Sequence, residues 1–380
     1  MKRLFIFLSI LLFSFTASSQ EKWQDVIKQA QGQTVYFNAW GGSQQVNNYI
    51  QWAAQQLKKK YDINLVQVKV NDTVDTVSRL IAEKAAGKNK NGSIDLVWIN
   101  GNNFYSLKSN HLLYGPFVER LPNWKLVNHS LPVTEDFSVP TDGYEAPWGV
   151  GQLVFLYDSV RLKNPPKSFA ELLSYAKAFP GRVSYPKPPE FHGSSFLEAA
   201  LVELTHNDPS LYQPVSKASF SAATKPLWQY LDQLHPYMWR GGRQFPSGAN
   251  QMIQLLDDDQ LDIAIAFNPN IVPAMQADGR LSDTVKAYAM SDGALTNVNF
   301  LAIPWNASAK AGALVAINFL MSPEAQSKKG DIKVWGAPAV IKRQYLTGPA
   351  KQDKLFKSIS QPAQSWQSAL EVAWQKRYGF

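Results

Sequence analysis

Three consecutive strand–helix pairs near the start of the chain constrain its fold more than any other feature. Apolar or alternating runs of strand length occupy residues 34–39, 63–70 and 94–99, and a segment with helical periodicity follows each of them. Strands that alternate with helices pair in parallel, with right-handed crossovers. The sequence therefore predicts an α/β fold built on a mostly parallel sheet flanked by helices.

Polar and aromatic residues gather where these strands end. The strand ends carry Trp40-Gly41-Gly42, Asn71, and Asn100-Gly101-Asn102. Open parallel sheets bind ligands outside the carboxyl ends of their strands, and glycines let backbone N–H groups approach a bound group. These residues are therefore candidate ligand contacts. The alternatives are burial of Trp40 in the core and helix capping by the asparagines. The glycine turn lacks the GxxxxGK pattern of a phosphate loop.

Length and composition narrow the class of protein. A chain of 380 residues exceeds the size at which one core usually suffices, so two lobes are expected. The net charge of +8 comes without the Lys/Arg clustering of a nucleic-acid groove, and the longest basic run, Lys58-Lys59-Lys60, falls at a predicted helix end. Cysteine is absent, which excludes disulfides, thiol catalysis and a lipid-modified cysteine anchor.

The first 19 residues have the pattern of a secretory signal. Lys2 and Arg3 precede an apolar stretch over residues 4–15, and Ala17-Ser18-Ser19 offers small residues for cleavage after Ser19. The alternative, a membrane anchor, needs a longer apolar stretch. Removal of this segment takes away two cations, so the net charge falls from +8 to +6. The mature protein is expected in the periplasm.

A late segment, residues 299–330, combines a strand, a turn and two helices. The strand-length run Phe300–Ile303 stops at Pro304, and a helical pattern covers Ala311–Met321. Ser322-Pro323-Glu324 then restarts a helix, with serine as N-cap and proline in the first turn. Two further segments are distinctive: YEAPWGVGQLVFLYD at 144–158, and NPPKSFAELL at 164–173, where Ser168 and Glu171 form a capping box.

In these three segments the chain resembles the type II periplasmic solute-binding proteins of ABC importers. The resemblance implies two α/β lobes, each with a mostly parallel sheet flanked by helices, joined by a hinge. It implies a first lobe of residues 20–150 plus 299–342 and a second of 151–298 plus 343–380. It also implies a monomer without enzymatic activity or cofactor, which closes on a small solute and delivers it to an inner-membrane ABC permease.

The resemblance adds site residues to those at the strand ends. Trp148 is expected to project into the cleft at the hinge, and the helix start near Ser194 to contact ligand. No histidine has a partner at metal-ligand spacing, and Asp257-Asp258-Asp259 fits an exposed helix end better than a calcium loop. For His192 a capping or surface role is the alternative. The predicted ligand-binding set is Trp40, Gly41, Gly42, Asn71, Asn100, Asn102, Trp148, Tyr185, His192, Ser194, Ser195, Asn268 and Asn297.

The nature of the solute stays open. Aromatic candidates favour a planar or cationic organic molecule, whereas helix N-termini favour an anionic part, and a phosphorylated or zwitterionic compound would satisfy both. Iron binding through tyrosines is disfavoured because no adjacent tyrosine pair is present. Two rivals remain: an exported enzyme on the same fold, and a chemosensory accessory protein. Thiaminase-like chemistry uses a cysteine nucleophile, which this chain lacks, and no GxSxG or HExxH pattern replaces it.

Overall fold

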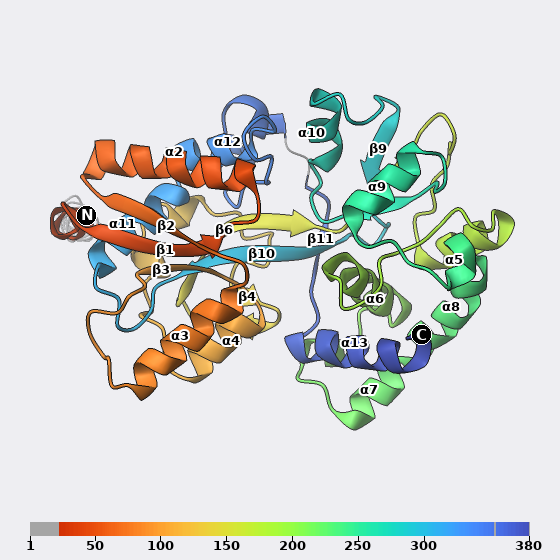
Figure 1. Ribbon diagram of the computed structural model, residues 1–380, viewed down its shortest axis with the longest axis horizontal. Helices are drawn as coiled ribbons and strands as arrows, with labels where there is room; N and C mark the ends of the chain where they lie inside the picture. Colours follow the sequence, from red (N-terminus) through yellow and green to blue (C-terminus); the bar gives the residue numbers. More distant parts are fainter. Residues whose placement is uncertain (1–22, 353–354, 380) are drawn as a thin grey trace, which may run out of the picture.

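The structure, a computed structural model, describes residues 23–352 and 355–379; the predicted signal segment lies outside the described residues. Two lobes lie side by side (Figure 1). Each has its own hydrophobic core, one built mainly from residues 30–150 and 298–325, the other from 153–295 and 363–374. Within the described ranges, no helix combines the length and apolar character needed to cross a membrane.

The first lobe carries the predicted parallel strands. Its sheet runs in the order β11-β10-β3-β1-β2, and β1 pairs in parallel with both β2 and β3. Helices cover the sheet, and residues 23–30 form a short helix before it. The elements are β1 (Thr34–Trp40), α2 (Gln44–Tyr61), β2 (Asn64–Val70), α3 (Thr73–Ala85), β3 (Leu96–Ile99), α4 (Asn102–Ser109), and the hairpin β4 (Glu135–Asp136) and β5 (Val139–Pro140).

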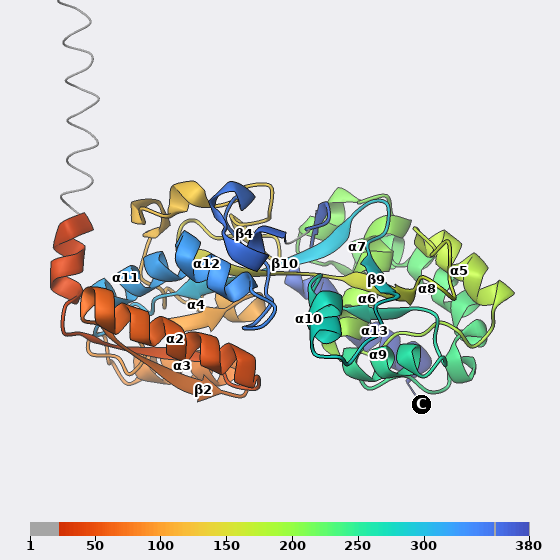
Figure 2. The ribbon, with the colours of Figure 1, turned by 90° about the horizontal axis from the view of Figure 1, so that it is seen from above.

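Two long strands connect the lobes. β6 (Glu145–Gln152) pairs antiparallel with β10 (Ala294–Ala302), and β11 (Ser358–Ser360) adds a short parallel partner to β10. Figure 1 shows β6, β10 and β11 crossing the middle of the molecule, and Figure 2 shows the lobes on either side of them. Three chain segments therefore link the lobes, as the resemblance implies for a hinge.

The second lobe differs from the prediction in its sheet. Its strands run in the order β8-β7-β9, and β7 pairs antiparallel with both neighbours, so the expected mostly parallel sheet is wrong here. The reason is that β7 leaves the hinge, whereas β8 and β9 run back toward it. The elements are β7 (Val154–Asp158), α5 (Phe169–Ala178), α6 (Phe191–Leu204), α7 (Lys217–Ala223), α8 (Lys225–Leu234), α9 (Ala249–Asp257), β8 (Ala264–Ala266), α10 (Ile271–Ala277) and β9 (Val285–Tyr288).

The last quarter of the chain returns to both lobes. α11 (Lys310–Leu320) is buried along most of its length. Ser322 is the N-cap of α12 (Pro323–Gly330), as predicted, and its hydroxyl accepts from the Ala325 N–H at 3.2 Å. The 3₁₀ turn at Gly348–Gln352 packs on α12 of the first lobe, although residues 343–380 were expected in the second. α13 (Gln364–Tyr378) buries Trp366, Leu370 and Trp374 in the second core, and Ile359 of β11 packs against it.

Candidate functional site

Trp40 stands at the carboxyl end of β1, on the first lobe. Its side chain is 42% exposed, and its ring lies 6.5 Å from that of Trp98, at nearly a right angle. A Cβ on Gly42 would come within 2.3 Å of the Trp40 ring, so the glycine is needed for the indole to fold back over its own turn. The turn thus presents an aromatic face at the end of the sheet.

The aromatic group continues toward the second lobe. Trp98 lies 5.9 Å from Trp335, a residue of the loop after α12. The neighbouring Gly336 carbonyl accepts a hydrogen bond from Asn270 Nδ2 at 3.2 Å, and Asn270 is the N-cap of α10 in the second lobe. The ring cluster therefore ends at a direct contact between the lobes.

The second lobe brings two more rings to this junction. Phe191, at the start of α6, is 42% exposed, and its ring lies 4.8 Å from that of Phe267, just after β8. A Cβ on Gly151 would lie 2.7 Å from the Phe267 ring and 2.8 Å from its carbonyl oxygen, so only glycine lets the hinge strand pass this close. We call the group Trp40, Trp98, Trp335, Phe191 and Phe267 the aromatic band.

A chain of side-chain hydrogen bonds also crosses from one lobe to the other. Asn100 Nδ2 donates to Asn297 Oδ1 at 3.2 Å and to Asn299 Oδ1 at 3.3 Å. Asn297 Nδ2 donates to Gln361 Oε1 at 2.8 Å, and Gln361 Nε2 donates to Glu198 Oε2 on α6 at 3.1 Å. The structure thus brings Asn100 and Asn297 together, as the sequence predicts for residues that share a site.

Buried carboxyl groups accompany this chain. Glu198 is 1% exposed, its Oε1 has no hydrogen-bond partner among the described residues, and burial raises its pKa to about 8. Burial likewise raises the pKa of Asp136 to about 8, although its carboxylate accepts from the Gly101 N–H at 2.6 Å. Burial and the nearby Asp136 raise the pKa of Glu145 well above its usual range. These carboxyls therefore hold protons at neutral pH.

One helix start at the junction, that of α6, is already capped by a carboxylate of the protein itself. Glu190 is the N-cap of α6 and accepts from the N–H groups of His192 at 2.8 Å and Gly193 at 3.1 Å. Partial burial alone would raise the pKa of Glu190, but these bonds and the His192 side chain outweigh it and lower the pKa. At the start of α4, Asp136 accepts from the N–H of Gly101, the N-cap residue, and no side chain that the structure describes caps the first turn of the helix. A ligand anion at the start of α6 would therefore find the His192 and Gly193 donors taken.

Trp148 does not project into the space between the lobes. Its side chain is fully buried, with ring distances of 4.9 Å to Trp98, 5.3 Å to Trp335 and 5.8 Å to Phe37. The prediction that it faces ligand is wrong, because both faces of β6 are covered and the indole packs into the first core. Its buried ring packs against Trp98 and Trp335 of the aromatic band.

Tyr185 is also in a core rather than at the junction. It is fully buried and stacks on Phe196, with ring centroids 4.5 Å apart. Its hydroxyl bonds Trp374 Nε1 at 2.7 Å and His235 Nε2 at 2.8 Å. The expectation that it lines the cleft is wrong, because the second core supplies both apolar contacts and hydrogen-bond partners.

The remaining predicted residues lie at element ends and mostly have local roles. Ser194 is buried and donates to Glu371 at 2.6 Å, and Ser195 donates to the Phe191 carbonyl at 2.8 Å. His192 Nδ1 pairs with Glu190 Oε1 at 2.8 Å. Asn268 accepts from the Asn270 N–H at 2.9 Å. Asn71 and Asn102 are exposed, and the Gly41 N–H bonds the Val70 carbonyl at 3.0 Å.

Sequence reasoning missed four of the five rings in the aromatic band, and it missed the buried carboxyls Glu198, Asp136 and Glu145. Phe267 immediately precedes the predicted Asn268, so the same strand-end argument could have found it. Glu198 interrupts an apolar stretch of α6, between Leu197 and Ala199, which also marks it. Trp335 lies in a loop without periodicity, and no local signal identifies it.

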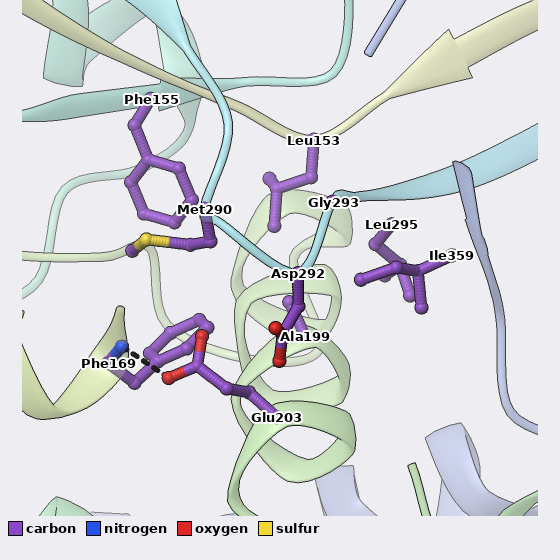
Figure 3. Close-up of a pocket in the computed structure, with 10 residues that line it drawn as sticks. All are labelled: Leu153, Phe155, Phe169, Ala199, Glu203, Met290, Asp292, Gly293, Leu295 and Ile359. Atoms are coloured by element: carbon purple, nitrogen blue, oxygen red, sulfur yellow. Dashed lines mark hydrogen bonds between the residues drawn. The ribbon is translucent and has the colours of Figure 1, made fainter. Parts of the chain in front are cut away.

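Two more acidic side chains, in addition to the three buried carboxyls above, lie beside the strands that link the lobes (Figure 3). Glu203 and Asp292 point toward each other beneath an apolar lining of Leu153, Phe155 and Met290. Glu203 accepts from the Phe169 N–H at 2.6 Å; burial and, more weakly, the Asp292 charge raise its pKa to about 6. The space they enclose is about 20 Å³, enough for a water molecule but not for a solute.

The fold and the junction define a class of protein. Two α/β lobes linked by paired strands, with aromatic and polar side chains meeting between them, form a periplasmic binding protein fold. The family of bacterial extracellular solute-binding proteins matches residues 52–358, more than half of the chain, and the chain belongs to this family. It is a solute-binding protein of the ABC-transporter class.

Individual relatives agree with this assignment. Over 376 residues the chain is 43% identical to protein YnjB of Escherichia coli, covering 97% of this chain and 96% of that protein. It is 24% identical to the putrescine-binding periplasmic protein SpuD of Pseudomonas aeruginosa, over 76% of each. The spermidine/putrescine transporter substrate-binding protein PotD of Streptococcus pneumoniae shares the fold, with a TM-score of 0.63 and 13% identity over 91% of this chain and 96% of that one.

Proposed function

We propose that this protein binds a small organic cation at the junction of its two lobes and delivers it to an inner-membrane ABC permease. The observation that carries the choice of a cation is the Glu190 carboxylate, which occupies the start of α6 next to Phe191. An anion placed there would find the His192 and Gly193 N–H groups already taken and would be repelled by this carboxylate.

The aromatic band supports the same choice. Cations bind over the faces of tryptophan and phenylalanine rings, and Trp40 and Phe191 each keep 42% of their side-chain surface exposed. Glu190 and Glu371 add carboxylates beside Phe191 and Ser194. The name of the related SpuD, a putrescine-binding protein, is consistent with a ligand of this charge.

We further propose that the protein acts without turnover, as is typical of its family. In the described part of the chain no three histidine, aspartate or glutamate side chains are arranged to hold a metal ion. The serine at the junction, Ser194, donates to Glu371 rather than to a histidine, so its hydroxyl lacks the base that nucleophilic serines use. Both a catalytic and a chemosensory role remain as rivals to transport.

One experiment tests localisation and ligand together. Native mass spectrometry of protein purified from its own periplasm should give a chain that begins at Gln20 and a co-purified mass of a small amine or planar cation. Calorimetric titration with putrescine, spermidine and thiamine then ranks the cations. Succinate, an anion without a phosphate group, serves as the anionic comparison.

Two variants test whether the cation binds at the junction. Trp40→Ala or Phe191→Ala should weaken cation binding about 2- to 30-fold, since a cation–π contact contributes about 0.5–2 kcal/mol. Phe179→Ala is the matched control, because Phe179 is 53% exposed on the same lobe as Phe191 but lies at the end of α5. Cation binding that both junction variants leave unchanged would show that the site is elsewhere, and a chain that retains residues 1–19 in the membrane fraction would refute the localisation.

A further inference from the structure

An open cavity of about 540 Å³ lies in the second lobe, at the end of α13 that points away from the first lobe. Asp232 of α8, His235, the turn Arg240–Arg243 and Tyr378 of α13 line it. Its volume lies in the range of sites for small organic molecules. None of these residues belongs to the interlobe junction, so this cavity is a separate feature of the fold.

The hydrogen bonds beneath the cavity determine how His235 faces it. An indole N–H can only donate, so Trp374 Nε1 donates to the Tyr185 hydroxyl at 2.7 Å. The Tyr185 hydroxyl then uses its own proton toward His235 Nε2, 2.8 Å away. His235 Nε2 is thus an acceptor, and the neutral imidazole carries its proton on Nδ1.

His235 stays neutral at physiological pH, because burial lowers its pKa to about 4. The residue is only 9% exposed, and its Nδ1 has no hydrogen-bond partner within residues 23–352 and 355–379. The N–H on Nδ1 is therefore available to donate to a ligand or to water. The cavity that His235 lines is where such an acceptor would sit.

The charged groups around the cavity leave a positive excess. Asp232 is neutralised by Arg377, whose Nη2 lies 2.5 Å from the carboxylate, and it also accepts from the Tyr378 hydroxyl at 2.7 Å. Arg240 and Arg243 have no carboxylate partner among the described residues. Arg240 is held in a left-handed conformation, with φ of 51°, in a turn completed by Gly241 and Gly242. Two arginines and one neutral imidazole therefore line the same cavity, and the Arg240 guanidinium lies over the Trp239 ring, 4.3 Å from its centroid.

We propose that this cavity is a binding site for a small phosphate monoester. Two guanidinium groups and an imidazole N–H match the charge and the several acceptor oxygens of a phosphate monoester dianion. The His235 and Tyr378 rings, 4.3 Å apart, provide an apolar wall for the organic part of the molecule. The shared chemistry, a terminal phosphate, is available from a soluble metabolite or from a lipid headgroup, and the open cavity of limited volume favours the soluble source.

The test uses the full mature protein and three phosphate probes: inorganic phosphate, fructose 6-phosphate, and vesicles that contain phosphatidic acid. Calorimetry should show binding of fructose 6-phosphate to the wild type, more weakly for inorganic phosphate, and no retention on the vesicles. Arg243→Gln should reduce the affinity for fructose 6-phosphate at least tenfold. Arg280→Gln, an exposed arginine of the same lobe that pairs with Asp278, should leave that affinity unchanged.

Two further results separate this site from the junction. Putrescine affinity should be the same in Arg243→Gln and in the wild type, and Trp40→Ala should not change the affinity for fructose 6-phosphate. Equal losses in Arg243→Gln and Arg280→Gln would mean that only net charge matters and would overturn the proposal. So would the absence of any binding to the wild type, or binding to the vesicles without binding of the soluble ester.

Discussion

The interlobe junction and the outer cavity of the second lobe both rest on aromatic rings, but the charged groups beside the rings have opposite sign. At the junction, the Glu190 carboxylate caps the start of α6 next to Phe191. At the outer cavity, Arg240 and Arg243 line the same space as the His235 imidazole. An aromatic surface accommodates many planar or cationic molecules, so the neighbouring charges decide which ligand each region accepts.

The two regions also differ in what their hydrogen bonds connect. The chain from Asn100 through Asn297 and Gln361 to Glu198 joins one lobe to the other. The chain from Trp374 through Tyr185 to His235 stays inside the second lobe. A solute at the junction can therefore shift the equilibrium between lobe arrangements, whereas an occupant of the outer cavity contacts a single rigid unit.

The largest expected effect distinguishes the buried Trp148 from the exposed Trp40, which both contact Trp98. Trp148→Ala removes a fully buried indole and should destabilise the first lobe by about 3–5 kcal/mol. Trp40→Ala removes a half-exposed ring that contacts Trp98, and should cost about 0.5–1.5 kcal/mol. Urea unfolding monitored by circular dichroism gives both values. Similar losses in the two variants would mean that Trp40 belongs to the core as much as Trp148 does.

Local sequence signals predicted most of the first lobe and the two helix starts capped by Ser168 and Ser322. Ser168 and Ser322 cap their helices as expected, because an N-cap is formed within four residues. The parallel order of β1, β2 and β3 followed from the alternation of strands and helices. The direction of β7 did not, because it depends on where the hinge enters the second lobe.

Side-chain direction was the part of the site that the sequence could not supply. A tryptophan between Pro147 and Gly149 on a strand can face either side, and β6 is buried on both, so no polar alternation distinguishes them. Tyr185 was misplaced for a related reason, since its partners His235 and Trp374 lie 50 and 189 residues away. Contacts over such separations come from tertiary packing rather than from local pattern.

The second prediction uses pH to test the buried acids of the junction. Between the ordinary glutamate pKa of 4.5 and the value of about 8 in the folded protein, native Glu198 keeps a proton that the unfolded chain has released. Stability should therefore fall as pH rises through this window, by up to about 1.4 kcal/mol per pH unit for this one group. Glu198→Gln removes the effect, so the variant should gain on the wild type as pH increases.

Urea unfolding at pH 5, 6.5 and 8 measures this difference. Some pH dependence should persist in Glu198→Gln, because Asp136 has a similarly raised pKa and remains in the variant. Glu119→Gln, a change at an exposed residue of the first lobe, is the control and should follow the wild type at every pH. A constant difference between Glu198→Gln and the wild type would mean that Glu198 is already ionised in the native protein.

The smallest expected effect comes from changing Glu190, and it tests most directly whether the two regions differ in the charge of the ligand they accept. Glu190→Ala removes the carboxylate that caps α6 and should cost about 0.5–2 kcal/mol of stability, whereas Glu190→Gln keeps a side-chain acceptor and should cost less. Both lose a negative charge beside Phe191, so putrescine should bind about fivefold more weakly to each. Only Glu190→Ala frees the N–H groups of His192 and Gly193, and only this variant should gain affinity for phosphate at the junction.

Glu171 accepts the Lys167 N–H at 2.7 Å at the start of α5, so Glu171→Ala loses a comparable hydrogen bond far from the rings and should leave both titrations unchanged. If Glu190→Ala binds putrescine as tightly as the wild type and gains no phosphate binding, then the capping carboxylate does not set the charge preference of the junction.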